Sequence, residues 1–289
     1  SFASSRDSVL DSDETPPRIR AGIEFLRAKG IEHIVVIGHD MGAAMAASFV
    51  AGEPRSGIDG LVVVGLDAPV LGGALRVNGR ILTDDFKYEE KTRIFSTPVE
   101  DQQFVYLQEQ DDTEVGARYT RKLGPAWDVE LVGLRTTRDR LTNDIFTTPG
   151  AASLFAVDRY TVETIGRGVL KHRMSPRLSF EVGGERAVNT LDSDTSFNAN
   201  GVDVPVPAGS VEVEEDRKEL FAKAAWRPLD TFTVDAGVRY EFSTISSEGD
   251  VLLEKSLRYL KPRLAVSWAP DPLTQVRLRL EREVDQLNF

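Results

Sequence analysis

A strict alternation of apolar and polar residues constrains the fold of this chain more than any other feature of its sequence. Within Thr231–Phe242 the even-numbered positions are apolar or aromatic, and the odd-numbered positions are polar or glycine. Thr274–Val284 and Leu178–Arg186 show the same period. Because successive side chains of a strand point to opposite faces, these segments are predicted to form a sheet with one apolar face and one charged face.

The links between the predicted strands are of two kinds, short turns and longer polar segments. The short links are Lys122–Ala126, Ser175–Arg177, Arg227–Asp230 and Ala269–Leu273, and the long segments are 136–156, 187–217 and 243–256. In an antiparallel meander this order puts every tight turn at one end and every long loop at the other. Outer-membrane barrels have this asymmetry, with strands of about 9–11 residues crossing the bilayer. The sequence therefore predicts an antiparallel β-meander that is part of an outer-membrane β-barrel, with lipid as a partner.

The three tryptophans support the same interpretation. Trp127, Trp226 and Trp268 each lie beside a short link, and the last two fall on the apolar faces of their strands. Aromatic residues that face lipid at strand ends form the interfacial girdle of membrane barrels, so these three are predicted girdle residues. In the alternative interpretation the chain is a soluble β-sheet binding module whose charged face is in water. Alternation alone does not separate the two.

The N-terminal part has a different pattern. Arg18–Lys29 has the apolar spacing of an amphipathic helix that ends at Gly30, and Met41–Ala51 is a second helix of small residues. His33–Gly38 and Leu61–Leu66 are continuous apolar runs, which are typical of strands buried on both faces. A helix between two such strands predicts a βαβ fragment with a parallel sheet. The predicted fold class is therefore mixed, with this fragment preceding the meander.

Three parts follow from the change of pattern. Residues 1–71 are the βαβ fragment, 72–112 are a connector, and 113–289 are the antiparallel barrel-like region. Within the connector, Asn78-Gly79 stands between apolar flanks and predicts the type I′ turn of a hairpin. About eight or nine strands are expected after residue 71.

Composition excludes several classes of function. The 289-residue chain has 35 Lys and Arg against 46 Asp and Glu, a net charge of −11, so a nucleic-acid partner is not expected. It has no cysteine and three histidines, so neither a metal centre nor a cofactor is predicted. No apolar run reaches the roughly 18 residues of a membrane helix. The chain begins at Ser1 without Met or a signal peptide, which indicates a processed or truncated start.

One motif in the N-terminal part offers chemistry. Gly38-His39-Asp40-Met41-Gly42 stands between a predicted strand and a helix, the context of a nucleophile elbow, and the central carboxylate could act as the nucleophile. Around 18–68 the chain resembles the α/β-hydrolase superfamily, which implies Asp40 as a catalytic residue. That family also needs a histidine base downstream, and His172 lies in a predicted barrel strand. We therefore expect no enzyme activity, with a hydrolase that uses Asp40 as the alternative.

Residues 72–289 resemble the C-terminal β-barrel region of TonB-dependent outer-membrane receptors. The resemblance rests on the order and spacing of four stretches, which are YTRKLG at Tyr119–Gly124, SPRLSFE at Ser175–Glu181, AGVRY at Ala236–Tyr240 and LKPRLAVSWAP at Leu260–Pro270. It implies a location in the bacterial outer membrane. In the intact family it also implies ligand uptake with an energy-transducing partner, and a small-molecule ligand would meet the long loops.

The chain departs from the pattern of that family. No plug and no motif for the energy-transducing partner are found, and the expected strands number fewer than the roughly twenty-two of such transporters. We therefore expect a barrel fragment without transport activity and without that partner. A hydrolase-like part followed by part of a barrel indicates a fragment or a gene fusion. The ligand, the closure of the barrel and the oligomeric state do not follow from the sequence.

Overall fold

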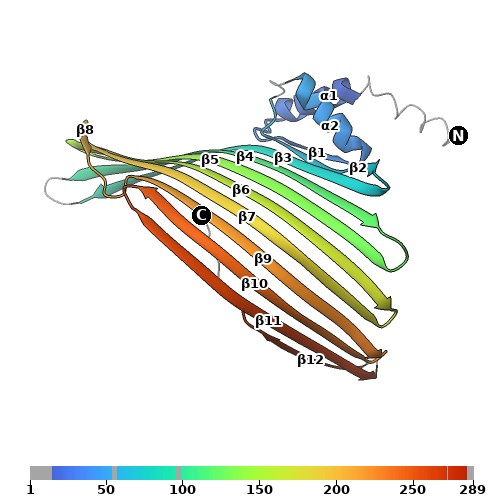
Figure 1. The fold of residues 1–289 in the computed structure, drawn as a ribbon. Coiled ribbons are helices and arrows are strands. Elements are labelled where there is room, and N and C mark those ends of the chain that lie inside the picture. The colour runs from blue at the N-terminus through green and yellow to red at the C-terminus, as the bar shows by residue number, and fades with distance from the viewer. Residues whose placement is uncertain (1–14, 54–56, 96–98, 272, 285–289) are drawn as a thin grey trace.

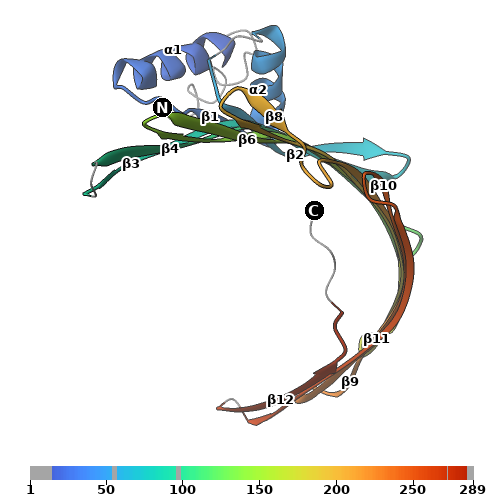
Figure 2. The same ribbon diagram turned by 90° about the vertical axis from the view of Figure 1, so that its left-hand side faces the viewer.

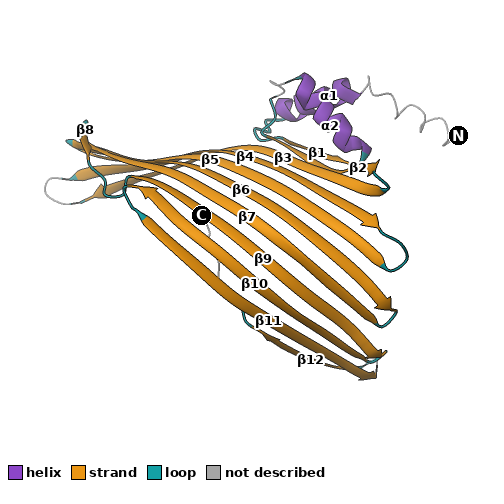
Figure 3. Ribbon diagram, in the orientation of Figure 1, coloured by secondary structure: helices purple, strands orange, loops and turns teal. Residues whose placement is uncertain are grey.

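The computed structural model describes residues 15–53, 57–95, 99–271 and 273–284 (Figure 1). Two helices, α1 (Thr15–Ala28) and α2 (Met41–Gly52), belong to the N-terminal part. The strands are β1 (Val35–His39), β2 (Gly60–Val70), β3 (Gly73–Ile94), β4 (Glu100–Lys122), β5 (Trp127–Thr148), β6 (Ala151–Ser175), β7 (Leu178–Ala199), β8 (Val202–Val204), β9 (Ser210–Leu229), β10 (Phe232–Gly249), β11 (Leu253–Asp271) and β12 (Thr274–Glu281). Strands make up most of the molecule (Figure 3).

All strands belong to one twelve-stranded sheet in the order β1-β2-β3-β4-β5-β6-β7-β9-β10-β11-β12, with β8 beside β7. β1 and β2 are parallel, and the other neighbours are antiparallel. The sheet curves into an open arc with α1 and α2 on its convex side (Figure 2). This architecture confirms the predicted partial barrel with an N-terminal βαβ fragment.

The connections between successive strands lie alternately at the two ends of the sheet. We call the end where β2–β3, β4–β5, β6–β7, β9–β10 and β11–β12 are connected the tight end. The distal end is where β3–β4, β5–β6, β7–β9 and β10–β11 are connected. The four predicted short links all lie at the tight end, as the sequence indicated.

The helices form where small and apolar residues permit close packing. α1 is terminated by Gly30, whose φ of +81° and whose N–H bond to the Arg27 carbonyl (2.9 Å) are those of a left-handed helix cap. Ala43 and Ala46 of α2 are buried against Leu61 and Val63 of β2. α2 therefore covers the convex face of β2. In the described part of the chain, no helix is long and apolar enough to cross a membrane.

Asn78-Gly79 does not form a turn, so the hairpin predicted in the connector is wrong. β3 runs through both residues, and the tight connection lies at Leu71-Gly72, where φ is +48° and +73°. The Asn78 side-chain oxygen instead accepts a hydrogen bond of 2.9 Å from the Gly65 N–H. At that point the β2–β3 register shifts between Val63 and Leu66. The bulge is on β2, where Gly65 has a φ of +73°, and the Asn78 side chain of the neighbouring strand completes it.

The three long polar segments are strands, which corrects their prediction as loops. β5 ends at Thr148 and β6 begins at Ala151, and β5–β7 and β9–β11 have between 18 and 25 residues each. About 9–11 residues suffice to cross a bilayer, so each strand continues well beyond that length. A sheet with water on both faces carries polar residues on both, and this composition had suggested loops.

The segment 72–112 is also part of the sheet rather than a connector. It supplies β3 and the first half of β4, and β2 is the hydrogen-bonded neighbour of β3 across the expected boundary near 71–73. The strands after residue 71 therefore exceed the expected eight or nine, because this segment and the short β8 were not counted.

The pairing of the polar strand extensions can be tested by disulfide cross-linking, because the chain has no cysteine of its own. Thr137 and Val162 are Cα partners on β5 and β6. We expect Thr137→Cys/Val162→Cys to form a disulfide, detected by mass spectrometry. Thr137→Cys/Thr161→Cys is the control, because its side chains point to opposite faces and should not cross-link. Equal cross-linking of both pairs would mean that 136–156 is a mobile loop.

Candidate functional site

The two faces of the sheet have opposite chemistry near the tight end. Cα partners on neighbouring strands point to the same face, so the convex face can be followed from Leu61 across the sheet. It carries the even-numbered residues 232–240 of β10. Their partners on this face are Leu220, Ala222 and Ala224 of β9, Leu260, Pro262, Leu264 and Val266 of β11, and, through β11, Val276, Leu278 and Leu280 of β12. The prediction that the apolar positions of β10 and β12 share the outward face is confirmed.

This apolar band has the length that a membrane-crossing strand needs. It extends from Phe232 to Tyr240 on β10, and a tilted strand crosses the hydrocarbon core with about 9–11 residues. Beyond Phe242 the convex positions of β10 become polar, beginning with Thr244 and Ser246. The Tyr240 and Phe242 rings are in edge contact at 4.5 Å and mark this distal margin of the band.

The predicted girdle residues lie at the opposite margin. Trp226 and Trp268 lie on the convex face, each three residues before the end of its strand at the tight end, and Trp127 is the first residue of β5. About half of each side chain surface is exposed. Their assignment as an interfacial girdle stays a prediction, and their position is the one that it requires.

The concave face carries charges that are paired between neighbouring strands. The N–O distances are between 2.7 and 3.8 Å for Lys171–Glu130, Lys223–Glu181, Arg217–Glu185, Arg239–Glu219, Lys261–Glu241 and Arg263–Glu281. The shortest of these pairs, Lys261–Glu241, is also the most buried, with side chains 12% and 4% exposed. Charges held in this way suit a wall that is polar and contacts water along part of its surface.

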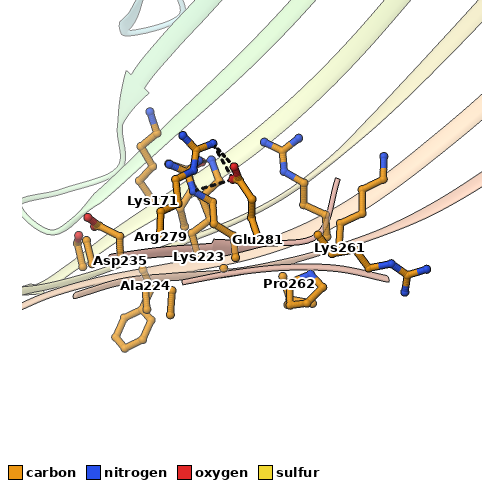
Figure 4. Close-up of a pocket in the computed structure, with 18 of the residues that line it drawn as sticks. Lys171, Lys223, Ala224, Asp235, Lys261, Pro262, Arg279 and Glu281 are labelled. Atoms are coloured by element: carbon orange, nitrogen blue, oxygen red, sulfur yellow. Dashed lines mark hydrogen bonds and ion pairs between the residues drawn. The ribbon is translucent and has the colours of Figure 1, made fainter. Parts of the chain in front are cut away.

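A hollow of about 1060 Å³ opens on the concave face near the tight end. Its lining includes eight cationic and five acidic residues from β5–β7, β9–β12 and the segment after β12. Lys171, Lys223, Lys261 and Arg279 point into it, whereas Ala224 and Pro262 point to the convex side (Figure 4). The expected placement of Arg239 and Arg279 on the concave side is confirmed. The hollow joins residues from 128 to 284, so sequence patterns of single strands do not reveal it.

Aromatic side chains gather on the concave face at the distal end. The register aligns Tyr88 with Tyr106, and then with Asp144, Phe155 and Phe197, along one row of β3–β7. Phe104 and Phe146 are partners in the next row, and the rings of Phe86 and Tyr106 are 5.9 Å apart. We call Phe86, Tyr88, Phe104, Tyr106, Phe146, Phe155 and Phe197 the distal aromatic cluster. The sequence analysis missed it, because all seven lie in the connector 72–112 or in the long polar segments 136–156 and 187–217.

Two polar groups, the Tyr88 hydroxyl and the Asp144 carboxylate, lie in the same row of this cluster. The Tyr88 hydroxyl donates a hydrogen bond of 3.1 Å to the Glu90 carboxylate, which raises the pKa of Tyr88 and keeps the phenol protonated. One carboxylate oxygen of Asp144 is buried without a hydrogen-bond partner among the described residues. Aromatic faces next to an unpaired acceptor can bind a small molecule that has a ring or a planar group and a hydrogen-bond donor.

The predicted elbow has the expected backbone geometry. Asp40 lies between β1 and α2 with φ 52° and ψ −117°, a strained conformation for a residue other than glycine. A Cβ at Gly38 would overlap the Gly42 carbonyl, so the glycine is required for the tight approach. The Asp40 carboxylate is exposed, and the His39 Nδ1 lies 3.0 Å from its Oδ2.

The downstream histidine does not join this elbow. His172 lies on β6, which is separated from β1 by β2, β3, β4 and β5. Its ring stacks on Trp127 with a centroid distance of 4.0 Å. His33 contacts Asp59 at 3.5 Å instead of Asp40. Within the ranges that the structure describes, no group of three His, Asp or Glu side chains is arranged to bind a metal.

Comparison with family models assigns most of the chain to one family. Residues 64–282 match the family described as TonB dependent receptor-like, beta-barrel. Residues 8–93 match a family described as a protein of unknown function (DUF3530). The resemblance of the N-terminal part to α/β-hydrolases therefore stays a prediction. No curated protein matches the chain.

The chain has a weak similarity to several solved structures. The ferric-catecholate import receptor Fiu of E. coli K12 is 9% identical over 69% of this chain and 45% of its own, with a TM-score of 0.45. The ferric preacinetobactin receptor BauA of Acinetobacter baumannii is 9% identical over 72% and 40%, also at 0.45. The ferric yersiniabactin receptor FyuA of Yersinia pestis is 8% identical over 69% and 36%, at 0.45. The chain thus spans less than half the length of each.

The concave ion pairs generate a stability prediction. We expect Lys261→Met to destabilise the fold by about 3–5 kcal/mol, because it leaves the Glu241 carboxylate buried without its partner. The measurement is urea unfolding in detergent, followed by tryptophan fluorescence. Arg93→Met is the control: it breaks a pair with Asp101 that is 61% and 62% exposed and should cost less than about 1 kcal/mol. Adding Glu241→Gln to Lys261→Met should recover part of the loss. Equal effects of the two single variants would mean that Glu241 is in water.

Proposed function

The chain belongs to the TonB-dependent receptor-like β-barrel family, and from this membership we propose that it forms a wall segment of an outer-membrane barrel. The convex apolar band contacts lipid. The concave face, with its paired charges and its hollow, lines a hydrophilic passage. Uptake and the energy-transducing partner are properties that the family implies, and in this proposal the chain contributes the wall along which a ligand passes.

The observation that carries the proposal is the exposure of the apolar band. A soluble sheet buries its apolar face against another layer. Here Val238, Leu260, Val276, Leu278 and Leu280 lie side by side and are between 41% and 56% exposed. Together with the length of the band on β10, from Phe232 to Tyr240, this supports lipid as the contacting phase and favours the membrane wall over the soluble binding module.

The distal aromatic cluster is the place where we propose that a small-molecule ligand contacts this wall. It lies on the same concave face as the passage and at the end of the strands that faces away from the tight turns. The unpaired Asp144 oxygen adds an acceptor within the row. The ligand contact therefore lies on extended strands rather than on the long loops that the sequence suggested.

A second candidate function, hydrolysis at Asp40, has one observation in its favour, the strained elbow backbone. We propose that the chain lacks this activity. Covalent catalysis by a carboxylate needs a base to activate water for the second step, and that base must be within hydrogen-bond reach of the reacting centre. His39 contacts the Asp40 carboxylate itself, and His172 lies on a distant strand.

Lipid contact predicts a depth-dependent effect of charge on the convex face. Ala236 is at the centre of the band and Thr244 lies beyond its distal margin, on the same face of the same strand. We expect Ala236→Lys to destabilise the folded state in phosphatidylcholine vesicles by about 2–4 kcal/mol, and Thr244→Lys by no more than about 1 kcal/mol. Urea unfolding in the vesicles measures both. Equal tolerance of the two lysines, or a stable monomer without detergent, would favour the soluble module.

The absence of hydrolysis predicts that Asp40 can be neutralised without consequence. The purified chain should turn over no ester, epoxide or haloalkane substrate, and Asp40→Asn should leave the background rate unchanged. Product formation is followed by chromatography. Wild-type turnover that Asp40→Asn abolishes would instead establish the hydrolase.

A further inference from the structure

A row of cations crosses the convex face immediately beyond the apolar band. The Cα partner of Arg186 on β7 is Lys218 on β9, the partner of Lys218 is Phe242 on β10, and the partner of Phe242 is Arg258 on β11. We call Arg186, Lys218 and Arg258 the basic row. It lies one convex position distal to Tyr240, so it occupies the margin where the apolar band ends.

The basic row keeps positive charge that the fold does not neutralise. Arg186 and Lys218 lie directly opposite each other on neighbouring strands, and like charges in such positions destabilise the pairing of the strands. One acid, Asp216, lies 2.9 Å from each of them. No acid lies within ion-pair distance of Arg258 in the part of the chain that the structure describes. Within ion-pair distance, the three cations therefore have one carboxylate, that of Asp216, and the Glu214 carboxylate acts on Arg186 from farther away.

The side chains of the row are free to reach a partner outside the protein. Arg186 and Lys218 are 62% and 59% exposed, and Arg258 is exposed as well. Phe242 stands between Lys218 and Arg258 and places an aromatic ring at the same level. Aromatic and basic side chains combine in this way at the boundary between the acyl chains and the headgroups of a bilayer.

We propose that the basic row binds the phosphate groups of anionic lipid headgroups in the leaflet at the distal end of the barrel wall. The guanidinium fork of Arg258 can bond two oxygens of one phosphate, and Arg186 and Lys218, which are held by Asp216, add positive charge beside it. Continuity with the apolar band selects lipid over a free anion, because acyl chains on the band place their headgroups at this row. The inference rests on the proposed membrane-wall function, since it requires lipid on the convex face.

The same face provides a matched control away from the band. Lys87 and Lys91 on β3 also share one acid, Glu89, at 3.4 and 2.9 Å, and they are 61% and 72% exposed. They lie at least six residues beyond Ile81, the last apolar convex residue before the polar extension of β3, which is roughly 20 Å at about 3.3 Å per residue. They therefore match the basic row in charge and exposure and differ in their distance from the band.

The test is lipid retention by the full chain, folded in dodecyl maltoside micelles that contain phosphatidylglycerol or phosphatidylcholine. Bound lipid is counted after gel filtration by a phosphorus assay. We expect wild type to prefer phosphatidylglycerol and the preference to fall with added salt. Arg186→Gln/Arg258→Gln should lower phosphatidylglycerol retention by about five-fold for each cation removed and leave phosphatidylcholine retention unchanged. Lys87→Gln/Lys91→Gln should change neither, and Arg186→Lys/Arg258→Lys should keep most of the preference.

Several outcomes would overturn the inference. One is wild-type retention without preference for phosphatidylglycerol. A second is an equal loss of phosphatidylglycerol retention in the Lys87/Lys91 control, which would indicate an effect of net charge alone. A third is displacement of the lipid by millimolar inorganic phosphate, which would indicate a site for free anions. If circular dichroism shows that the double glutamine variant loses structure, Arg258→Gln, which breaks no ion pair, provides the same test. Failure of wild type to retain either lipid, with a fold that is stable without detergent, would instead overturn the membrane-wall function.

Discussion

The register of the antiparallel ladder from β2 to β12 fixes every surface of this protein. Side chains alternate between faces with a period of two, so a slip of one residue in any strand would exchange its lipid-facing and passage-facing side chains. Such a slip would put Arg239 and Glu241 into the apolar band and Val238 and Tyr240 among the concave charges. Charges in hydrocarbon and buried acids without partners both cost free energy, so the observed register is more stable than a shifted one. The backbone hydrogen bonds between the strands hold this register.

The same constraint explains why charge is abundant on the concave face. A carboxylate such as Glu241 is stable there because a lysine of the neighbouring strand lies directly within reach. Ion pairs of this kind join neighbouring strands between β5 and β12. They keep the concave face polar while each charge is offset by one of opposite sign. On the convex face the corresponding positions are apolar near the tight end, and on β7, β9 and β11 cations return where the band ends, at the basic row.

The strand extensions beyond the band separate two levels of the molecule. Near the tight end the sheet has one apolar face and one charged face, as expected of a wall between lipid and water. Toward the distal end the convex positions of β10 are polar, and the distal aromatic cluster lies on the concave side of β3–β7. The Asp144 oxygen is one of five buried side-chain atoms without a hydrogen-bond partner among the described residues, and it is the one that lies in the row of that cluster.

The sequence alone determined the features that depend on neighbours along the chain. The alternation in Thr231–Phe242 predicted which residues share a face, and GHDMG predicted the elbow at Asp40, because both are properties of a few consecutive residues. Only the tertiary structure decided what depends on pairing between strands. The polar segments are strand extensions, and the Asn78 side chain completes a bulge at Gly65. The pairing of β7, β9, β10 and β11 places Arg186, Lys218 and Arg258 in one row. Polar residues are equally compatible with a loop and with a sheet in water, and the positions that meet across a ladder are set by hydrogen bonds between segments far apart in the sequence.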